Sequence, residues 1–202
     1  MSNYVAPTTT SGETSEVAAK TLITGTWLWI GADAFFFMAI FFAFVYLRAL
    51  NSNLMWNPKG QNPSLALGSI TLAAVVISAV LVQIGATRLR RAGAWSALAG
   101  GALALLVAAI LLQGWQLFKP GFSPGHAGAY GSVFIAFTAA YLLHLLGAGY
   151  VLETLLVGGR TRRYPVEPGT AELGSSYEAY ALYSYFLAAV FLIFYGLFYL
   201  VH

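Results

Sequence analysis

The chain has 202 residues, 59% of them hydrophobic and only 8% charged. Because about a quarter of the residues in a soluble domain are charged, this composition excludes a water-soluble globule and indicates that lipid surrounds most of the surface. Cysteine is absent, which excludes disulfides, thiolate metal sites and cysteine nucleophiles. The net charge of +3 is too small to indicate a nucleic-acid partner.

The chain begins with a polar segment. Residues 1–20 contain Pro7 and a run of Thr, Ser and Gly. They lack the basic start and short apolar core that are typical of a signal peptide. We expect a short flexible tail over residues 1–20, followed by a single domain over residues 21–202.

Five apolar stretches make up that domain. A membrane-spanning helix needs about 20 predominantly apolar residues, and the stretches that meet this length are about 22–48, 65–87, 94–117, 128–157 and 178–201. A backbone in lipid must satisfy its own hydrogen bonds, so long apolar runs form helices there. The sequence therefore predicts an all-α, polytopic membrane protein, a bundle of five transmembrane helices.

Lysine and arginine are unevenly distributed between the two ends of this bundle. Three of them, Arg48, Lys59 and Lys119, fall on one side of the membrane. The other side holds seven: Lys20, Arg88, Arg90, Arg91, Arg160, Arg162 and Arg163. Because cytoplasmic loops carry the excess of basic residues, we expect a cytoplasmic amino terminus and a carboxyl terminus outside. The basic turn at Arg88, Arg90 and Arg91 is expected to contact lipid headgroups.

Two ionisable side chains fall near the middle of predicted helices. Asp33 follows Trp29-Ile-Gly-Ala in the first helix. A charged carboxylate at that depth costs about 2.5–3.5 kcal/mol even on lenient insertion scales, so we expect Asp33 to face protein and to be either protonated or paired. His144 lies at a similar depth in the fourth helix, where it can reach Asp33 if the two helices pack. Two interpretations stay open for both: neutral groups that hydrogen-bond a neighbouring helix, or a proton-exchanging site.

The histidine count limits the redox chemistry of the chain. Of the three histidines, His126 and His202 lie at or beyond helix ends. Two haems would need several histidines at matched depths, and a thiolate copper centre would need cysteine. Neither a Walker A loop nor a Rossmann fingerprint is present. We therefore expect no redox centre, no metal ligand set and no nucleotide cofactor bound by this chain.

The remaining polar and aromatic side chains have structural interpretations. Gln113 and Gln116 are one turn apart and share a face of the third helix, where interhelical hydrogen bonds are the usual role of glutamine. The residues expected to pack helices in this way are Gln113, Gln116, Tyr141 and Tyr185. Tryptophans near helix ends are typical of the aromatic belts at membrane–water interfaces. The tryptophans expected there, in contact with lipid, are Trp29, Trp56 and Trp95.

These features together resemble subunit III of haem-copper terminal oxidases, in its short, five-helix bacterial form, from Thr21 onward. Residues 31–39 (Gly-Ala-Asp-Ala-Phe-Phe-Phe-Met-Ala) are similar to the first-helix motif of that family, with Asp33 at the position of a glutamate. Gln113-Gly-Trp-Gln116 is similar to a Gln-x-x-Glu motif. Tyr130-Gly-Ser-Val-Phe134 and Tyr141-Leu-Leu-His144 are similar to the opening and the His-Gly-Leu-His pattern of the fourth helix.

The chain also departs from the family pattern. Gln116 and Tyr141 stand where the family has an acid and a histidine, and Tyr185 and Ala188 replace the histidine and aspartate of the last helix. One carboxyl group and one histidine, Asp33 and His144, survive from the family's polar cluster.

The resemblance implies an accessory, non-catalytic role in a cytochrome c oxidase type of complex of aerobic electron transport, in the bacterial plasma membrane. It implies that oxidase subunit I is the main partner, with subunit II and other respiratory complexes as further partners. Haem and copper would be bound by the partners, and phospholipid would be bound in a cleft. Sustained proton uptake would depend on the chain. Alternatives are a subunit-III-like protein of a nitric oxide reductase, a small proton-coupled transporter built on Asp33 and His144, and a purely structural membrane protein.

Overall fold

The structure, a computed structural model, describes residues 15–51, 56–57, 62–91, 93–123, 126–160 and 171–201. These residues form α1 (Ser15–Leu50), α2 (Leu65–Arg90), α3 (Ser96–Phe118), α4 (Gly128–Arg160) and α5 (Ala171–Tyr195), and α5 continues into a π-helical turn, η3 (Gly196–Leu200). Within the described ranges, five helices are long and apolar enough to cross a membrane. The predicted all-α, five-helix architecture is therefore confirmed.

The first helix begins earlier than the sequence predicts. Residues 15–20, expected in the flexible tail, form the first turns of α1. The run Val17-Ala-Ala-Lys20 explains the difference, because alanine and lysine are strong helix formers. The rest of the predicted tail and the residues 161–170 between α4 and α5 lie outside the described residues.

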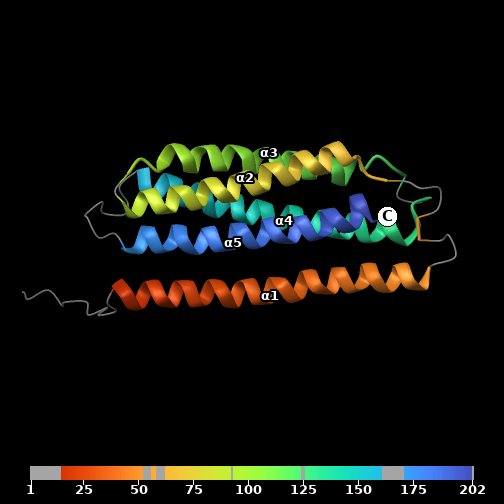
Figure 1. The fold of residues 1–202 in the computed structure, drawn as a ribbon, viewed down its shortest axis with the longest axis horizontal. Coiled ribbons are helices and arrows are strands. Elements are labelled where there is room, and N and C mark those ends of the chain that lie inside the picture. Colours follow the sequence, from red (N-terminus) through yellow and green to blue (C-terminus); the bar gives the residue numbers. More distant parts are fainter. Residues whose placement is uncertain are drawn as a thin grey trace, which may run out of the picture.

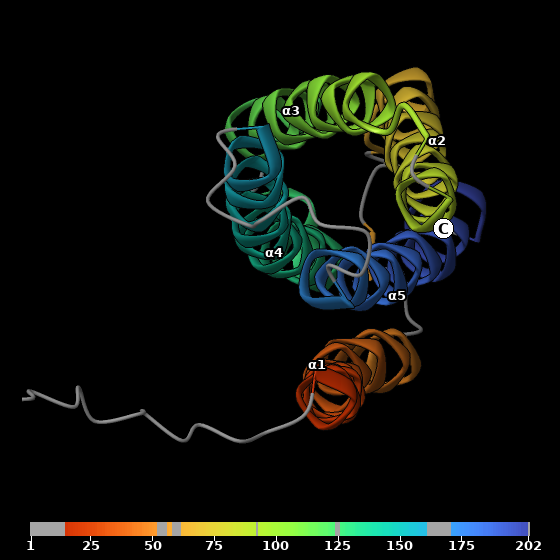
Figure 2. The ribbon, with the colours of Figure 1, turned by 90° about the vertical axis from the view of Figure 1, so that its left-hand side faces the viewer.

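Four of the helices surround a common core, and the fifth lies on its outside. Viewed end-on, α2, α3, α4 and α5 form a ring, and α1 lies beside α5 (Figure 2). The main contacts of α1 are with α5 and α4. All five helices run side by side, with the start of α1 and the carboxyl terminus at opposite ends of the bundle (Figure 1). The assignment of these ends to the two sides of the membrane stays a prediction.

Small side chains bring α2 and α3 close together. Ala79 and Ala86 on α2 are buried, as are Ala99 and Ala102 on α3. The Ser78 hydroxyl donates a hydrogen bond of 2.8 Å to the Ala102 carbonyl. Because lipid supplies no hydrophobic force between membrane helices, close backbone approach and such hydrogen bonds hold them together.

Aromatic rings fill the space between α4 and α5. The rings of Phe137 and Phe194 stack with centroids 4.1 Å apart. The buried hydroxyls of Tyr141 and Tyr130 donate to the carbonyls of Leu187 and Phe198, at 2.9 and 2.8 Å. The tyrosines thus fill volume and also satisfy backbone oxygens of α5 and η3, as buried polar groups require.

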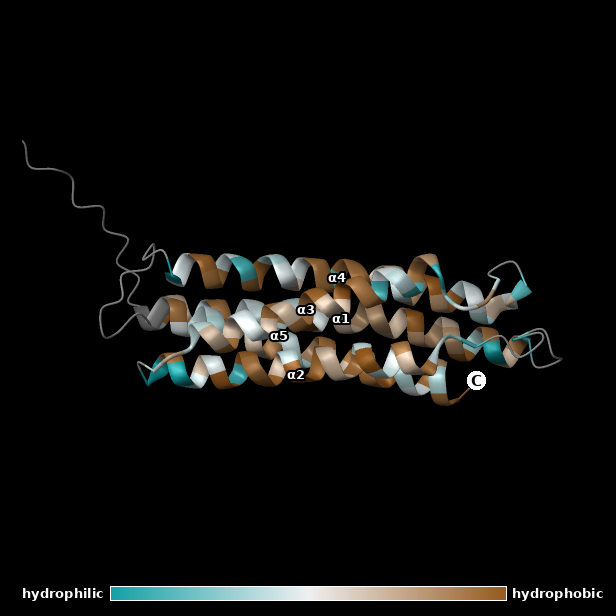
Figure 3. Cartoon of the chain, turned by 90° about the horizontal axis from the view of Figure 1, so that it is seen from above, coloured by the Kyte–Doolittle hydropathy of each residue, from teal (hydrophilic) through white to brown (hydrophobic). Residues whose placement is uncertain are grey.

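The outer face of α1 carries large apolar side chains that no other described part of the chain covers. Leu28, Phe35 and Phe42, spaced by seven residues, are 72, 82 and 63% exposed. Hydrophobic residues follow all five helices over most of their length (Figure 3). Such a surface is stable in lipid, and it is the arrangement that the composition predicts.

Candidate functional site

Asp33 lies where α1 meets α4 and α5. Its carboxyl group accepts a hydrogen bond of 2.9 Å from the Tyr183 hydroxyl on α5, to Oδ2. His144 Nε2 on α4 lies 3.6 Å from the same oxygen. Asp33 is 9% exposed. The structure therefore brings Asp33 and His144 together, as their similar depth predicts, and adds Tyr183. We call Asp33, His144 and Tyr183 the polar cluster.

The imidazole of His144 is held by its own helix and by aromatic rings. Its Nδ1 lies 2.7 Å from the Ala140 carbonyl oxygen, one turn earlier on α4. The ring centroids of Phe37 and Phe36 on α1 lie 4.8 and 5.6 Å from the imidazole centroid. These contacts orient the other ring nitrogen, Nε2, towards Asp33.

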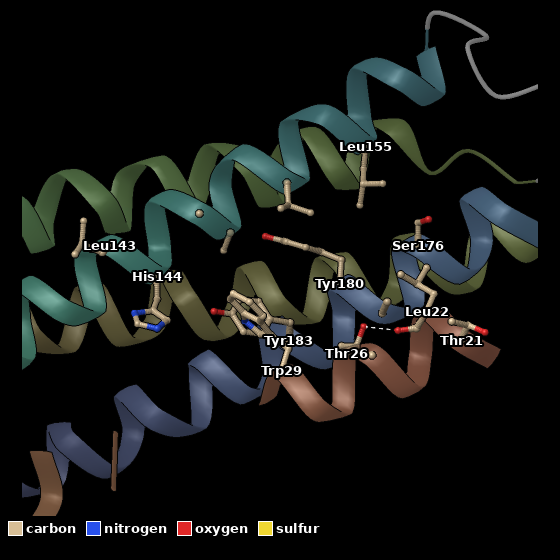
Figure 4. A pocket seen from close by; sticks show the side chains of 15 residues that line it. Thr21, Leu22, Thr26, Trp29, Leu143, His144, Leu155, Ser176, Tyr180 and Tyr183 are labelled. Carbon is tan, nitrogen blue, oxygen red and sulfur yellow. Dashed lines mark hydrogen bonds between the residues drawn. The ribbon is translucent and has the colours of Figure 1, made fainter. Parts of the chain in front are cut away.

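A cleft of about 840 Å³ lies between α1, α4 and α5, beside the polar cluster. His144 and Tyr183 line its inner end, and Trp29 and Tyr180 contribute to its walls (Figure 4). Along α4 it extends to Leu155, eleven residues or about 16 Å from His144 at the rise of an α-helix. Most of its lining is aliphatic and aromatic, with hydroxyl groups from threonine and serine at the far end.

Two glycines keep the cleft open. Gly25 on α1 and Gly147 on α4 both line it, and a Cβ atom added to either would meet nothing within 4 Å. Larger residues at these positions would project into the space. These two glycines therefore contribute to the open volume of the cleft.

The predicted glutamine face forms a second polar group, away from the cleft. Gln113 and Gln116 are each 2% exposed. Gln116 donates from Nε2 to Thr71 Oγ1 on α2 at 3.3 Å and accepts from the Tyr199 hydroxyl on η3. The side-chain oxygen of Gln113 is buried and has no hydrogen-bond partner among the described residues. The glutamines were found from the sequence, whereas Thr71 and Tyr199 were not.

The exposure of two residues, Tyr185 and Trp56, differs from what the sequence predicts. Tyr185, expected to pack helices, is 42% exposed, because the rotation of α5 turns Tyr183 inwards instead. Trp56, expected to contact lipid, is only 7% exposed, because its indole packs against the rings of Phe44 and Tyr130, with centroids 5.0 and 5.7 Å away.

The other predicted interface residues lie near the surface. Trp29 is 61% exposed beside the cleft, and Trp95 is half-buried, with its ring 5.1 Å from that of Tyr177. Arg88, Arg90 and Arg91 are exposed at the end of α2. Arg90 pairs with Glu178 at 3.1 Å, and an exposed pair of this kind contributes at most about 1 kcal/mol.

The part of the chain that the structure describes has no group of three or more histidine, aspartate or glutamate side chains placed to hold a metal ion. The polar cluster supplies one carboxyl, one imidazole and one phenol, which donate, accept and exchange protons.

Fold and site together define a polytopic membrane protein with one acid–histidine pair deep in its bundle, beside an apolar cleft. The family model for cytochrome c oxidase subunit III matches residues 2–202. The chain therefore belongs to the cytochrome c oxidase subunit III family. A comparison with curated proteins gave no match.

Proposed function

We propose that the chain is the accessory subunit III of a respiratory haem-copper oxidase of the cytochrome c oxidase type. Family membership over residues 2–202 supports a subunit III role. In this proposal the chain carries out no catalysis, and subunits I and II hold the haem and copper. The bacterial plasma membrane is the proposed location, with the amino terminus in the cytoplasm.

The observation that carries the proposal is the polar cluster at the inner end of the cleft. Asp33 and His144 are titratable groups deep in the bundle, 3.6 Å apart, and intramembrane residues of this kind typically mark proton pathways. His144 and Tyr183 also form part of the cleft wall. We propose that the cluster supports sustained proton uptake by subunit I.

The cleft is the proposed site of a bound phospholipid. Its apolar walls match acyl chains, and its far end carries hydroxyl groups of Thr21 and Ser176, which match the ester and headgroup region of a lipid. That end lies on the same side as the Arg88–Arg91 turn, where anionic headgroups are favoured. Lipid in the cleft would cover His144 and Tyr183 and would fill the gap between α1 and the four-helix ring.

Purification of the complex tests the proposal. The chain, extracted with a mild detergent, is expected to copurify with a larger haem-bearing protein that gives a reduced-minus-oxidised haem spectrum. Mass spectrometry would identify that protein, and its haem type would separate an oxygen reductase from a nitric oxide reductase. Isolation of the chain alone, with no haem protein, would contradict the proposal.

A further inference from the structure

The position of the proton on His144 follows from a single contact. A backbone carbonyl only accepts hydrogen bonds, so the 2.7 Å contact between Nδ1 and the Ala140 oxygen places a proton on Nδ1. In a neutral imidazole the other nitrogen, Nε2, is then an acceptor. This bare nitrogen faces Asp33 Oδ2 at 3.6 Å.

The Asp33 carboxyl group is fixed from its other side. The phenol of Tyr183 donates to Oδ2 at 2.9 Å, and the Trp29 side chain is a further hydrogen-bond partner of Tyr183. His144 and Tyr183 are the titratable groups that face Asp33 from α4 and α5. Tyr141 and Tyr180 are the further titratable groups that interact electrostatically with Tyr183.

The charge of the cluster depends on how many protons Asp33 and Nε2 hold together. With none the cluster carries −1, and with two it carries +1. With one proton it is neutral overall, whether the proton is on the carboxyl group or on Nε2. Because a net charge deep in the membrane is costly, the state with one proton is favoured over both others.

We propose that Asp33 and His144 share a single exchangeable proton and that Tyr183 is the positioning residue that holds the carboxyl group for this exchange. In one form Asp33 is a neutral acid and Nε2 is bare. In the other form the Asp33 O–H bond has broken, an N–H bond has formed at Nε2, and a carboxylate faces an imidazolium. No electron moves, and Nδ1 keeps its proton in both forms.

The geometry allows this transfer with little movement. The 3.6 Å separation is longer than a hydrogen bond, so the transfer requires Oδ2 and Nε2 to move closer together. His144 and Tyr183 also line the cleft, so the shared proton lies next to the proposed lipid site. This inference rests on the proposed function only for the use of the proton; the one-proton state is argued from the contacts of Asp33 and His144 and from the cost of a net charge in the membrane.

The protonation states can be measured without reference to turnover. The intact complex, labelled with ¹⁵N-histidine and reconstituted in lipid bilayers, would be studied by solid-state NMR between about pH 6 and about pH 8, where histidine ordinarily titrates. Difference spectra against His144→Gln isolate the His144 signals, and the shift caused by Asp33→Asn identifies them independently if His144→Gln does not assemble. Infrared difference spectra of Asp33→Asn isolate the acid carbonyl band of Asp33.

The one-proton state predicts two results. Nδ1 of His144 is protonated at every pH, and the fraction of Asp33 in the acid form and the fraction of Nε2 carrying a proton add to one. Tyr183→Phe changes the Asp33 band, whereas the matched variant Tyr185→Phe, on the exposed face of α5, leaves it unchanged. A neutral His144 protonated on Nε2 alone, or a sum near zero or two, would overturn the proposal.

The proposed function has a separate outcome. Normal turnover of Asp33→Asn over many cycles, together with a one-proton cluster, would remove the role in proton uptake and leave the shared proton in place. Faster decay of turnover in Asp33→Asn, together with the wrong tautomer of His144, would support proton uptake and overturn the one-proton proposal.

Discussion

The Tyr183 hydroxyl donates a 2.9 Å hydrogen bond to Asp33, and these two residues are 150 positions apart in the chain. The bond joins α5, a member of the four-helix ring, to α1 on its outside. Elsewhere α1 packs on α4 and α5 through aromatic side chains such as Phe37, whose ring centroid lies 6.3 Å from those of Phe137 and Phe194. In lipid such apolar contacts are weakly selective, so this bond has a direct part in fixing the rotation and depth of α1.

Replacing Tyr183 tests the structural part of this relationship. Tyr183→Phe removes the donor and leaves a buried carboxyl oxygen with fewer partners, at a cost of about 1–3 kcal/mol. We expect a lower midpoint of thermal unfolding in detergent than for wild type. Tyr185→Phe, two residues away and exposed, is the control and should leave the midpoint unchanged. Equal midpoints for both variants would show that the bond does not hold α1.

Gly68, near the start of α2, packs closely against the ring of Tyr199 on η3, so we expect it to tolerate no larger side chain. A Cβ atom at Gly68 would lie 2.5 Å from the ring of Tyr199, so Gly68→Ala forces η3 away from α2. Overpacking of this kind typically costs about 1–3 kcal/mol. The matched control is Gly114→Ala, where a Cβ meets nothing within 4 Å. The midpoint of thermal unfolding should be lower for Gly68→Ala than for Gly114→Ala. A Gly68→Ala protein with the wild-type midpoint would contradict the close packing of η3 on α2.

The two glutamines of α3 should differ in their contribution to stability. Gln116→Leu removes the acceptor of the Tyr199 hydroxyl and the donor to Thr71, which we expect to cost about 1–3 kcal/mol because buried partners lose their bonds. Gln113→Leu removes an oxygen that has no hydrogen-bond partner in the described parts of the chain and should cost less. A larger loss of stability in Gln113→Leu, measured by denaturation, would reverse this order.

Filling the cleft should displace the lipid. Gly147→Phe places a ring in the open space between α1, α4 and α5, and we expect less phospholipid to copurify with the complex, as quantified by mass spectrometry. Gly114→Phe adds the same ring elsewhere, where the surroundings are equally open. If both variants retained as much phospholipid as wild type, the cleft would not be the lipid site.

The five helices were predictable from the sequence because each needs only a long apolar run. Asp33 and His144 were found for a related reason: polar residues in such runs are rare and costly, so each one indicates a contact. Their pairing followed from depth alone.

Which of Tyr183 and Tyr185 faces the interior of the bundle was not predictable in the same way. The helix α5 is hydrophobic on all sides, so its sequence pattern does not show which face turns inwards. Trp56 is a similar case. Its position after α1 predicts an interfacial tryptophan, but tertiary contacts with Phe44 and Tyr130 bury it. The cleft depends on the relative position of three helices, which no local pattern encodes.

The most direct test of the proposed role in sustained proton uptake is the rate of oxygen consumption over many turnovers by complexes that contain Asp33→Asn. Glu153→Gln, which makes the same change at an exposed position of α4, is the matched control. Asp33→Asn is expected to assemble, to start at the wild-type rate and to lose activity faster, whereas Glu153→Gln should follow wild type. Identical time courses for wild type and both variants would contradict a proton-related role of Asp33.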